Sequence, residues 1–306
     1  MNFPRPIIKE LWTYPIKSCG GVSHDSQKTT STGLGDDRIF VIVGKDENGE
    51  NEVLTQRKYP TLAKVALRKA EGGYLIDALN ETLFLDLETE MAGKPERVTL
   101  FEKSGRAAEV HPQIGELFSE LVDRDVRLMR EVDARVIKPA TFSSAMGANN
   151  QTAFADGYPM LIASQASLGQ VNKWLANEGH EAIDMARFKP NIVFDTAYDV
   201  QGNSTPFGED FWKGLKLGNV GAAVVRACAR CAISAINPET GEFDAAGRAL
   251  NHVLNTYRRG TDPVNGRKGR FFGQNIVHNY IAQDITVDDT ITVYHRVDQR
   301  NIAGLE

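Results

Sequence analysis

The chain has 306 residues, of which 42% are apolar and 25% are charged. This is an ordinary globular composition, and the length allows one large domain or two smaller domains that each bury a core. The formal net charge of −5 excludes a general electrostatic bias toward nucleic acid or anionic membranes. An anionic ligand would therefore have to be held by a local cluster of cationic side chains.

The cysteine content indicates the compartment. The chain has only three cysteines, Cys19, Cys228 and Cys231, and a small odd number is typical of a reducing environment rather than a disulfide framework. The N-terminal residues lack the basic and apolar regions of a signal peptide, and no apolar run is long enough for a membrane helix. We therefore expect a soluble cytoplasmic protein that binds neither membranes nor nucleic acid.

The first part of the chain is rich in strand signals. Residues 7–17 and 38–44 carry many β-branched and aromatic side chains, and the polar residues 45–51 contain an Asn-Gly hairpin signal. Residues 72–87 predict a pair of strands interrupted at an asparagine. Apolar residues at helical spacing predict a short helix over residues 112–122.

The second part mixes one clear helix with further strands. The small polar residues of 137–157 predict a crossing between two halves and a surface loop that borders a site. Residues 164–179 predict a helix with Ser164 as its N-cap and Gly179 at its end. Strands are expected at 191–194, 221–227, 232–236, 274–281 and 289–295. The class is mostly β with some α (α+β), which suggests barrels or sandwiches.

Cys228 and Cys231 form a C-x-x-C stretch with three conventional interpretations. A zinc site would need two more ligands, and no second ligand pair at suitable spacing accompanies them. A thioredoxin-like pair normally opens a helix, whereas residues 232–236 predict a strand. The pair could also be two small buried residues. However, Arg226 and Arg230 flank it, and positive charge favours an accessible thiolate suited to a soft metal centre or an anionic ligand.

Other polar and cationic side chains stand near expected strand ends. Lys17 and Ser18 precede two glycines, and Arg38 follows a glycine-rich turn. Each is by default a solvated surface residue, and spacing alone does not show that these positions meet in space. The remaining candidates of this kind are Arg187, Lys189, Asn191, Tyr257, Arg258 and Arg259.

Taken together, these stretches resemble the MOSC family, named for the C-terminal domain of molybdenum cofactor sulfurase. More narrowly, the chain is similar to bacterial YcbX-type proteins and mitochondrial amidoxime-reducing components. The resemblance covers nearly the whole chain, from about Leu11 to Tyr294. It rests on "YPIKSCGG" (14–21), "DDRIFVIV" (36–43), "LTQRKYP" (54–60), "FADGYPMLIASQASL" (154–168), "RFKPNIV" (187–193), "CARCAISAINPETG" (228–241) and "FGQNIV" (272–277).

The resemblance implies an N-terminal β-rich domain over 1–130 packed on a C-terminal MOSC β-barrel over 131–306. It also implies a molybdenum cofactor in the cleft between them, since Lys17 and Arg38 come from one part and Cys231 from the other. Cys231 is the implied molybdenum ligand and catalytic residue, with Cys228 and Cys19 as structural neighbours. The implied cofactor-binding residues are Lys17, Ser18, Arg38, Gly157, Tyr158, Lys189, Asn191, Ala229, Arg230 and Tyr257.

Two of these positions depart from the family pattern. Lys189 stands where the family usually has arginine, so bidentate geometry is lost, and we expect Arg187 to compensate. Ala229 replaces a serine that is common between the two cysteines, which leaves only a backbone contact. The sequence names no proton donor. Asp156 is predicted to cap its loop, with proton donation as the alternative interpretation.

The implied activity is reduction of N-hydroxylated compounds: amidoximes, hydroxylamines or N-hydroxylated bases. Once Cys231 is assigned to molybdenum, two cysteines cannot hold an iron–sulfur cluster. Electrons would therefore come from a separate ferredoxin- or flavin-type protein, unless the natural chain continues further. Two alternatives stay open: a molybdenum cofactor or sulfur carrier without turnover of its own, and a scaffold with a zinc-bound C-x-x-C.

Overall fold

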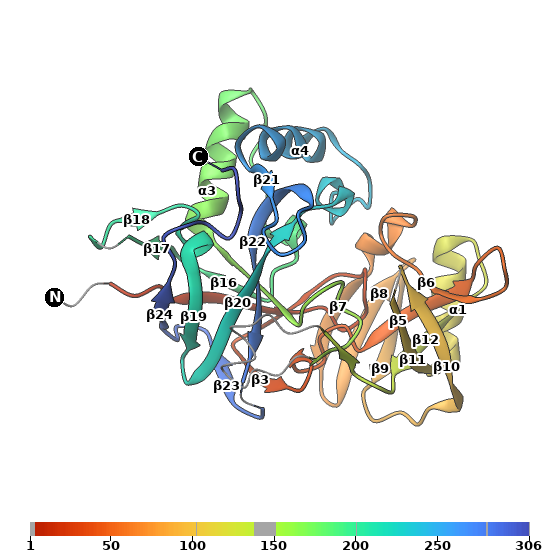
Figure 1. Cartoon of the computed structure of the whole chain (residues 1–306). Coiled ribbons are helices and arrows are strands. Elements are labelled where there is room, and N and C mark those ends of the chain that lie inside the picture. The colour runs from red at the N-terminus through yellow and green to blue at the C-terminus, as the bar shows by residue number, and fades with distance from the viewer. Residues whose placement is uncertain (1–3, 102, 138–150, 200, 280, 306) are drawn as a thin grey trace.

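The computed structural model describes residues 4–101, 103–137, 151–199, 201–279 and 281–305. Strands dominate these residues, which confirms the predicted mostly-β class with some helix. Figure 1 shows two bodies side by side, an orange and yellow N-terminal body and a green and blue C-terminal body. None of the helices in the described part of the chain is long and apolar enough to cross a lipid bilayer.

The N-terminal body is built on a closed barrel. Its strands, in order around the barrel, are β10 (Ala92–Leu100), β11 (Lys103–Glu109), β12 (Val126–Glu131), β5 (Phe40–Lys45) and β6 (Asn51–Val53). The hairpin predicted around residues 45–51 is confirmed by the antiparallel pairing of β5 with β6.

Other elements of this body also follow the predicted pattern. The predicted strand pair is β8 (Gly73–Ala78) with β9 (Glu81–Asp86), which forms a small sheet with β7 (Ala66–Ala70). The predicted helix is α1 (Pro112–Val122), which buries Ile114, Leu117 and Phe118 on one face.

The C-terminal body is built on a nine-stranded sheet. Its strands, in order, are β2 (Val22–His24), β1 (Ile8–Thr13), β16 (Ile192–Phe194), β15 (Met160–Ser164), β22 (Lys268–His278), β20 (Val220–Ala229), β19 (Trp212–Leu217) and β24 (Ile291–Arg296), and β21 (Arg259–Thr261) pairs with β22. The sheet separates two cores, because Ile192 and Phe194 face one core and Val193 faces the other.

Helices cover one face of this sheet (Figure 1). The predicted helix is α3 (Gln165–Asn177), and the Ser164 hydroxyl accepts the amide of Ser167 as its N-cap at 3.0 Å. Beside it lies α4 (Ala245–Tyr257), which packs Leu250, Val253 and Leu254 into the same core. A three-stranded sheet of β23 (Asp284–Thr286), β3 (Ser26–Thr30) and β4 (Gly33–Leu34) completes this body.

One local prediction is wrong, and one helix was not predicted. Residues 232–236 were expected to form a strand but form the 3-10 helix η4 (Ala232–Ala235), in which the Ser234 hydroxyl donates to the Cys231 carbonyl at 3.0 Å. Helix α4 was not expected at all, although Asp244 caps it by accepting the amide of Gly247 at 2.7 Å. The two elements pack closely, since a Cβ atom at Gly247 would lie 2.1 Å from the Ala235 carbonyl oxygen.

Several strands near the N-terminus belong to the C-terminal body. Strand β1 pairs with β16 of the C-terminal sheet, and β3 pairs with β23 on one side and β4 on the other. The domain boundary at residues 130/131 stays a prediction. Of the predicted crossing segment 137–157, residues 138–150 lie outside the described residues.

Candidate functional site

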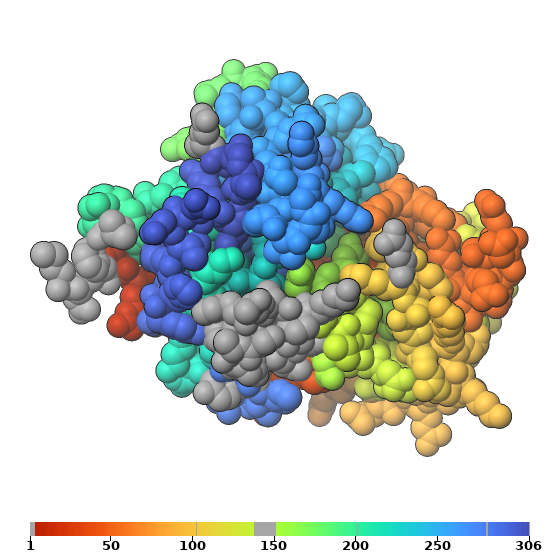
Figure 2. Space-filling model, viewed as in Figure 1, coloured from red at the N-terminus to blue at the C-terminus, as the bar shows by residue number. Residues whose placement is uncertain are grey.

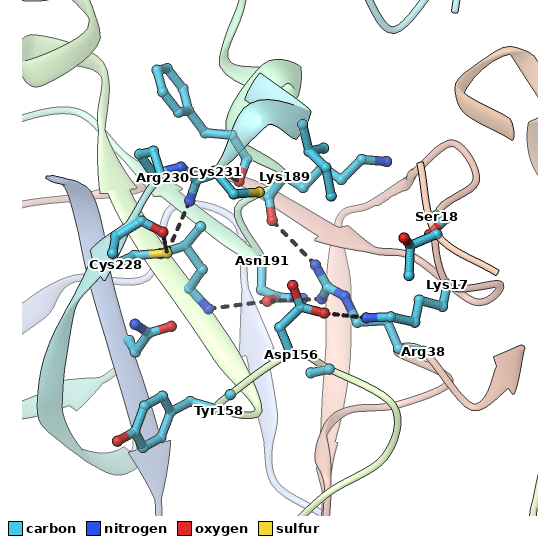
Figure 3. A pocket seen from close by; sticks show the side chains of 18 of the residues that line it. Lys17, Ser18, Arg38, Asp156, Tyr158, Lys189, Asn191, Cys228, Arg230 and Cys231 are labelled. Atoms are coloured by element: carbon cyan, nitrogen blue, oxygen red, sulfur yellow. Dashed lines mark hydrogen bonds and ion pairs between the residues drawn. The ribbon is translucent and has the colours of Figure 1, made fainter. Parts of the chain in front are cut away.

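A cavity of about 360 Å³ lies where the two bodies meet. Figure 3 shows Cys228, Arg230 and Cys231 on one wall, Lys17, Ser18 and Arg38 on the opposite wall, and Asp156 between them. The structure therefore brings Lys17 and Cys231 to one cavity, as the sequence predicted. Of the predicted site residues, all but Tyr257 line this cavity: Lys17, Ser18, Arg38, Gly157, Tyr158, Lys189, Asn191, Ala229, Arg230 and Cys231.

The N-terminal wall is held by an interlock of two turns. The amide of Lys17 donates to the Phe40 carbonyl, and the amide of Arg38 donates to the Tyr14 carbonyl, both at 2.9 Å. The Asp37 carboxylate in turn accepts the amide of Tyr14 at 2.9 Å. Each turn therefore fixes the other, and both cations are presented from rigid backbone.

Backbone strain is concentrated at this site. Ser18, Arg38 and Lys189 have φ values of 75°, 55° and 50°. This left-handed region is unfavourable for residues with a Cβ atom, and such residues persist only where the surroundings impose the conformation. Three polar residues of one cavity thus share a conformation that is uncommon for their types, which supports a functional role for the cavity.

Arg38 is oriented by several contacts. Its guanidinium donates to the Asp37 carboxylate at 2.5 Å and to the Asn191 side-chain oxygen at 3.3 Å, and it lies 4.5 Å from the centre of the Tyr14 ring. Asn191 is itself buried, and its side chain also accepts the amide of Leu161 at 3.1 Å. Asn191 therefore positions Arg38 and the adjoining strand.

Among the described residues, the Asp156 carboxylate accepts no backbone amide of its own loop, so the capping prediction finds no support there. This carboxylate forms an ion pair with Lys17, and Arg57 lies 3.7 Å away. Desolvation would raise the pKa of Asp156, but Lys17, Arg57 and Arg38 outweigh it and lower this pKa to about 2. The carboxylate is therefore ionised at neutral pH and cannot serve as a proton donor there. Burial lowers the pKa of Lys17, and the Asp156 charge opposes that effect.

The cysteine wall begins where β20 ends. The amide of Arg230 donates to the Arg270 carbonyl at 2.8 Å, which holds the C-x-x-C stretch against β22. The Arg230 guanidinium donates to the Cys228 sulfur at 3.0 Å and to the Phe188 carbonyl at 2.8 Å. Its buried Nε atom has no hydrogen-bond partner within the described part of the chain. Cys231 is half-buried and lines the cavity directly before η4.

The third cysteine is unsuited to bind a ligand. Cys19 is fully buried, and burial raises the pKa of its thiol to about 12. Its carbonyl oxygen accepts the Lys189 ammonium group at 2.7 Å. Desolvation and the nearby Arg38 lower the pKa of Lys189 to about 8, so its ammonium group is close to losing a proton at neutral pH.

Two expectations about neighbouring residues are not met. Arg187 does not compensate for Lys189 in the cavity, since it is buried and pairs with Asp244 at 2.5 Å. Tyr257 does not line the cavity either. Its ring lies at the end of α4, stacked on Trp174 with 4.6 Å between the ring centres.

Several lining residues had no assigned role. Arg57 lies in the stretch "LTQRKYP", which carried the family resemblance, and packs 4.3 Å from the centre of the Phe101 ring. Lys103 donates to the Asp156 carbonyl at 2.8 Å, and Arg226 forms an ion pair with the buried Asp262. Arg57 could have been found from its position in this motif. No sequence signal pointed to Lys103, because only the folded barrel brings this residue to the cavity.

The charge balance of the cavity favours an anion. Seven cationic residues are among the described lining residues, together with the carboxylate of Asp156. Asp156 pairs with Lys17, and the neighbouring Asp37 and Asp262 pair with Arg38 and Arg226. A thiol stands beside them, so the donor set suits a ligand that carries both a soft metal and an anionic group. The described part of the chain contains no group of three or more His, Cys, Asp or Glu side chains placed to hold a metal, so the zinc interpretation finds no ligand set there.

Comparison with known proteins identifies the family. Residues 5–125 match the family model of the MOSC N-terminal beta barrel domain, and residues 149–292 match that of the MOSC domain. Mitochondrial amidoxime-reducing component 1 of Homo sapiens is 30% identical over 283 residues, 88% of this chain and 78% of the human protein. Mitochondrial amidoxime reducing component 2 of Bos taurus is 28% identical over 244 residues, 78% of this chain and 68% of the bovine protein.

A second group of relatives is longer. The molybdenum cofactor sulfurase of Oryza sativa subsp. japonica is 26% identical over 304 residues, which cover 94% of this chain but 34% of the sulfurase. Both domain models match in the order that the sequence resemblance predicted. The chain therefore belongs to the MOSC-domain family and is similar to its amidoxime-reducing components.

Proposed function

We propose that this chain binds a molybdenum cofactor in the cavity between its two bodies and reduces N-hydroxylated compounds such as amidoximes, hydroxylamines and N-hydroxylated bases. The observation that carries the proposal is the placement of the Cys231 thiol in a cavity where cations outnumber carboxylates. The names of the relatives, amidoxime-reducing components and molybdenum cofactor sulfurases, support the choice of cofactor and substrate.

Different residues of the cavity would bind different parts of the cofactor. Cys231 would bind the metal through its thiolate, and Lys17, Arg38 and Arg230 would bind the terminal phosphate and the pterin through charged hydrogen bonds. The buried Nε atom of half-buried Arg230 has no hydrogen-bond partner among the described residues, which leaves a donor for such a ligand. Ser18, Gly157, Tyr158, Lys189, Asn191 and Ala229 would complete the surroundings, whereas Tyr257 would not reach the cofactor.

When bound, the cofactor supplies the two-electron chemistry that removes oxygen from an N–OH group, and two protons complete the release of water. The chain must therefore hold an acid near the substrate. Asp156 is ionised at neutral pH, so it does not meet this need. The Lys189 ammonium group, with its pKa lowered to about 8, is the better proton donor among the cavity residues.

We expect electrons to come from a separate ferredoxin- or flavin-type protein. The relationship to sulfurases favours a second candidate function, a molybdenum cofactor or sulfur carrier without turnover. A carrier would hold the cofactor at Cys231 but would leave amidoximes unchanged. The cytoplasmic location expected from the cysteine content stays a prediction.

The test begins with metal analysis. Wild type, Cys231→Ala and Cys228→Ala are produced in cells that synthesise the cofactor, and molybdenum and zinc are measured by mass spectrometry. We expect stoichiometric molybdenum in wild type and in Cys228→Ala, and its loss in Cys231→Ala. Molybdenum retained by Cys231→Ala, or zinc in its place, would refute the assignment of the metal ligand.

Turnover then separates the two candidates. Molybdenum-loaded protein is given benzamidoxime with dithionite-reduced methyl viologen as the electron donor, and benzamidine is measured. A reductase forms benzamidine, and Cys231→Ala does not. Molybdenum-loaded wild type without turnover would point to a carrier.

A further inference from the structure

A second cationic cavity lies next to the first. It has a volume of about 380 Å³ and is lined by Arg230, Asn255, Arg259, Lys268, Gly269 and Arg270. Four of these six residues are cations, and no carboxylate is among its described lining residues. For a protein with a net charge of −5, this is a strong local concentration of positive charge. We call Arg259, Lys268 and Arg270 the basic hairpin.

The cations of the basic hairpin lie close together, and their mutual repulsion destabilises the hairpin. Arg259 on β21 is directly opposite Arg270 on β22, and like charges at opposite positions of an antiparallel pair destabilise it. Within the described residues, none of the three cations forms a salt bridge, and the buried Nε atom of Arg270 has no hydrogen-bond partner. The carboxylate within the same hairpin, Asp262, pairs with Arg226 instead. Folding alone does not explain this arrangement, whereas an acidic partner does.

The basic hairpin is coupled to the proposed metal ligand through Arg230. Arg230 lines both cavities, and its amide donates to the Arg270 carbonyl at 2.8 Å. Cys231 is the next residue of the chain. A molecule seated on the hairpin would therefore lie beside the metal-binding wall and not on the opposite side of the protein.

The exposure of the surface suits a transient protein partner. Arg259 and Lys268 are exposed, and Val264 in the turn between β21 and β22 is 61% exposed, an apolar contact beside the charges. Figure 2 shows the mid-blue segment that contains this hairpin at the visible surface, close to where the C-terminal body meets the orange N-terminal body. Long, solvated cations of this kind steer an oppositely charged protein and release it readily.

We propose that the basic hairpin docks an acidic electron-transfer protein, which delivers electrons to the cofactor held at Cys231. This inference rests on the proposed function. Two successive dockings of a one-electron carrier each oxidise one carrier by one electron, and together they supply the two electrons that reduce the N–OH compound to the N–H product and water. The two protons are drawn from solvent through the cavity.

The experiment compares charge reversal at the hairpin with charge reversal elsewhere. The test variant is Arg259→Glu/Lys268→Glu, and neither residue lines the cofactor cavity. The control is Lys45→Glu/Lys94→Glu, two exposed lysines on the N-terminal barrel. The probe is an acidic plant-type [2Fe–2S] ferredoxin, reduced enzymatically and also used unreduced for binding by surface plasmon resonance over a range of salt concentrations.

We expect the hairpin variant to lose about tenfold or more in ferredoxin affinity and in ferredoxin-driven kcat/KM at low salt, with a flattened salt dependence. The control variant should match wild type in all three measurements. Viologen-driven turnover should be equal in all proteins. Equal ferredoxin binding by the hairpin variant and wild type, or no ferredoxin binding by wild type, would overturn the docking site.

Failure of the proposed function gives a different result. If no protein turns over benzamidoxime with viologen, the reductase assignment fails, while the binding measurement still reports on the hairpin. Salt-dependent ferredoxin binding lost only in the hairpin variant would then support the surface without the reaction.

Discussion

The two bodies of the molecule are stabilised by different means. The N-terminal body buries apolar side chains such as Phe118 of α1 against Ile42 and Leu128 of the barrel strands. The C-terminal sheet buries charge next to its apolar core, since Arg258 and Asp210 are each 1% exposed and lie 2.8 Å apart. Gln274 donates to the same carboxylate at 2.8 Å. The C-terminal body therefore adds a fully buried ion pair to its apolar packing, whereas the ion pairs of the barrel, such as Arg127 with Glu96, are partly exposed.

The same contrast extends to the site. The N-terminal body presents cations from strained turns, while the C-terminal body presents the thiol pair at the end of a long strand. Both bodies contribute residues to the lining of the cavity. The cavity depends on both, so each of the following experiments compares a change in one body with its counterpart in the other.

The largest expected effect comes from breaking the buried ion pair. Arg258→Ala leaves Asp210 buried without its partner, and we expect a loss of ~3–5 kcal/mol in the free energy of unfolding. Phe118→Ala on α1 of the N-terminal body should cost a similar ~3–5 kcal/mol by creating a cavity. Urea unfolding at several pH values distinguishes them, because only the Arg258→Ala deficit should shrink at low pH, where Asp210 can take a proton. Equal pH dependence would contradict the proposed difference between the bodies.

A smaller effect concerns Glu209, which is fully buried beside Asp210. Desolvation and the Asp210 charge raise the pKa of Glu209 from 4.5 to about 7. Between these values the folded protein keeps a proton that the unfolded chain releases, so stability falls as the pH rises from about 4.5 to about 7. We expect this fall to reach up to ~3 kcal/mol and to be absent in Glu209→Gln.

Glu131 gives the matched comparison in the barrel. Desolvation raises the pKa of Glu131 to about 7, but its side chain is only half-buried. Glu131→Gln should therefore flatten the pH profile less than Glu209→Gln does. The measurement is the free energy of unfolding of the three proteins across this pH range, and a larger effect at Glu131 would reverse the comparison.

The smallest expected effect compares the N-terminal wall, which carries Lys17, with the cysteine wall, which carries Cys231. Lys17→Ala removes one charged hydrogen bond to the ligand and leaves the Asp156 carboxylate facing it, so we expect roughly a tenfold lower affinity for the molybdenum cofactor. Cys231→Ala should abolish retention altogether. Asp156→Asn removes the opposing charge and should keep the metal, and adding it to Lys17→Ala should restore part of the loss. Molybdenum content after dialysis checks all four. Full retention by Lys17→Ala would show that the N-terminal wall is dispensable.

Local signals in the sequence predicted local structure well. The Asn-Gly hairpin between β5 and β6, the Ser164 cap of α3 and the helix over 112–122 all depend on neighbouring residues and are confirmed. The strand expected at 232–236 is wrong, and the isoleucines at 233 and 236 are three positions apart, a spacing that suits one 3-10 turn better than the alternation of a strand. Helix α4 had a capping aspartate and apolar residues at helical spacing, so its signal was present in the sequence.

The site residues were predictable from the family motifs rather than from composition or residue spacing. Composition and spacing did not show that Lys17 and Cys231 meet, and the family resemblance did. Contacts made by folding alone stayed hidden: Lys103 reaches the cavity from the barrel, and Asp156 pairs with Lys17. Arg187 and Tyr257 have the right residue types, but their partners, Asp244 and Trp174, hold them elsewhere. The roles of the lining residues stay predictions until cofactor binding is measured.

The membership of β1 in the C-terminal sheet has a consequence for folding on the ribosome. Strand β1 can pair early with β2, but Ile8 pairs with Phe194, so this strand pair cannot join the rest of the sheet until residues far along the sequence have been made. Contacts of such sequence separation slow folding, because a long loop must close before they form. The turn that carries Lys17 follows β1 directly. The cavity is therefore assembled late, and the nascent chain cannot take up a ligand there before its C-terminal body is complete.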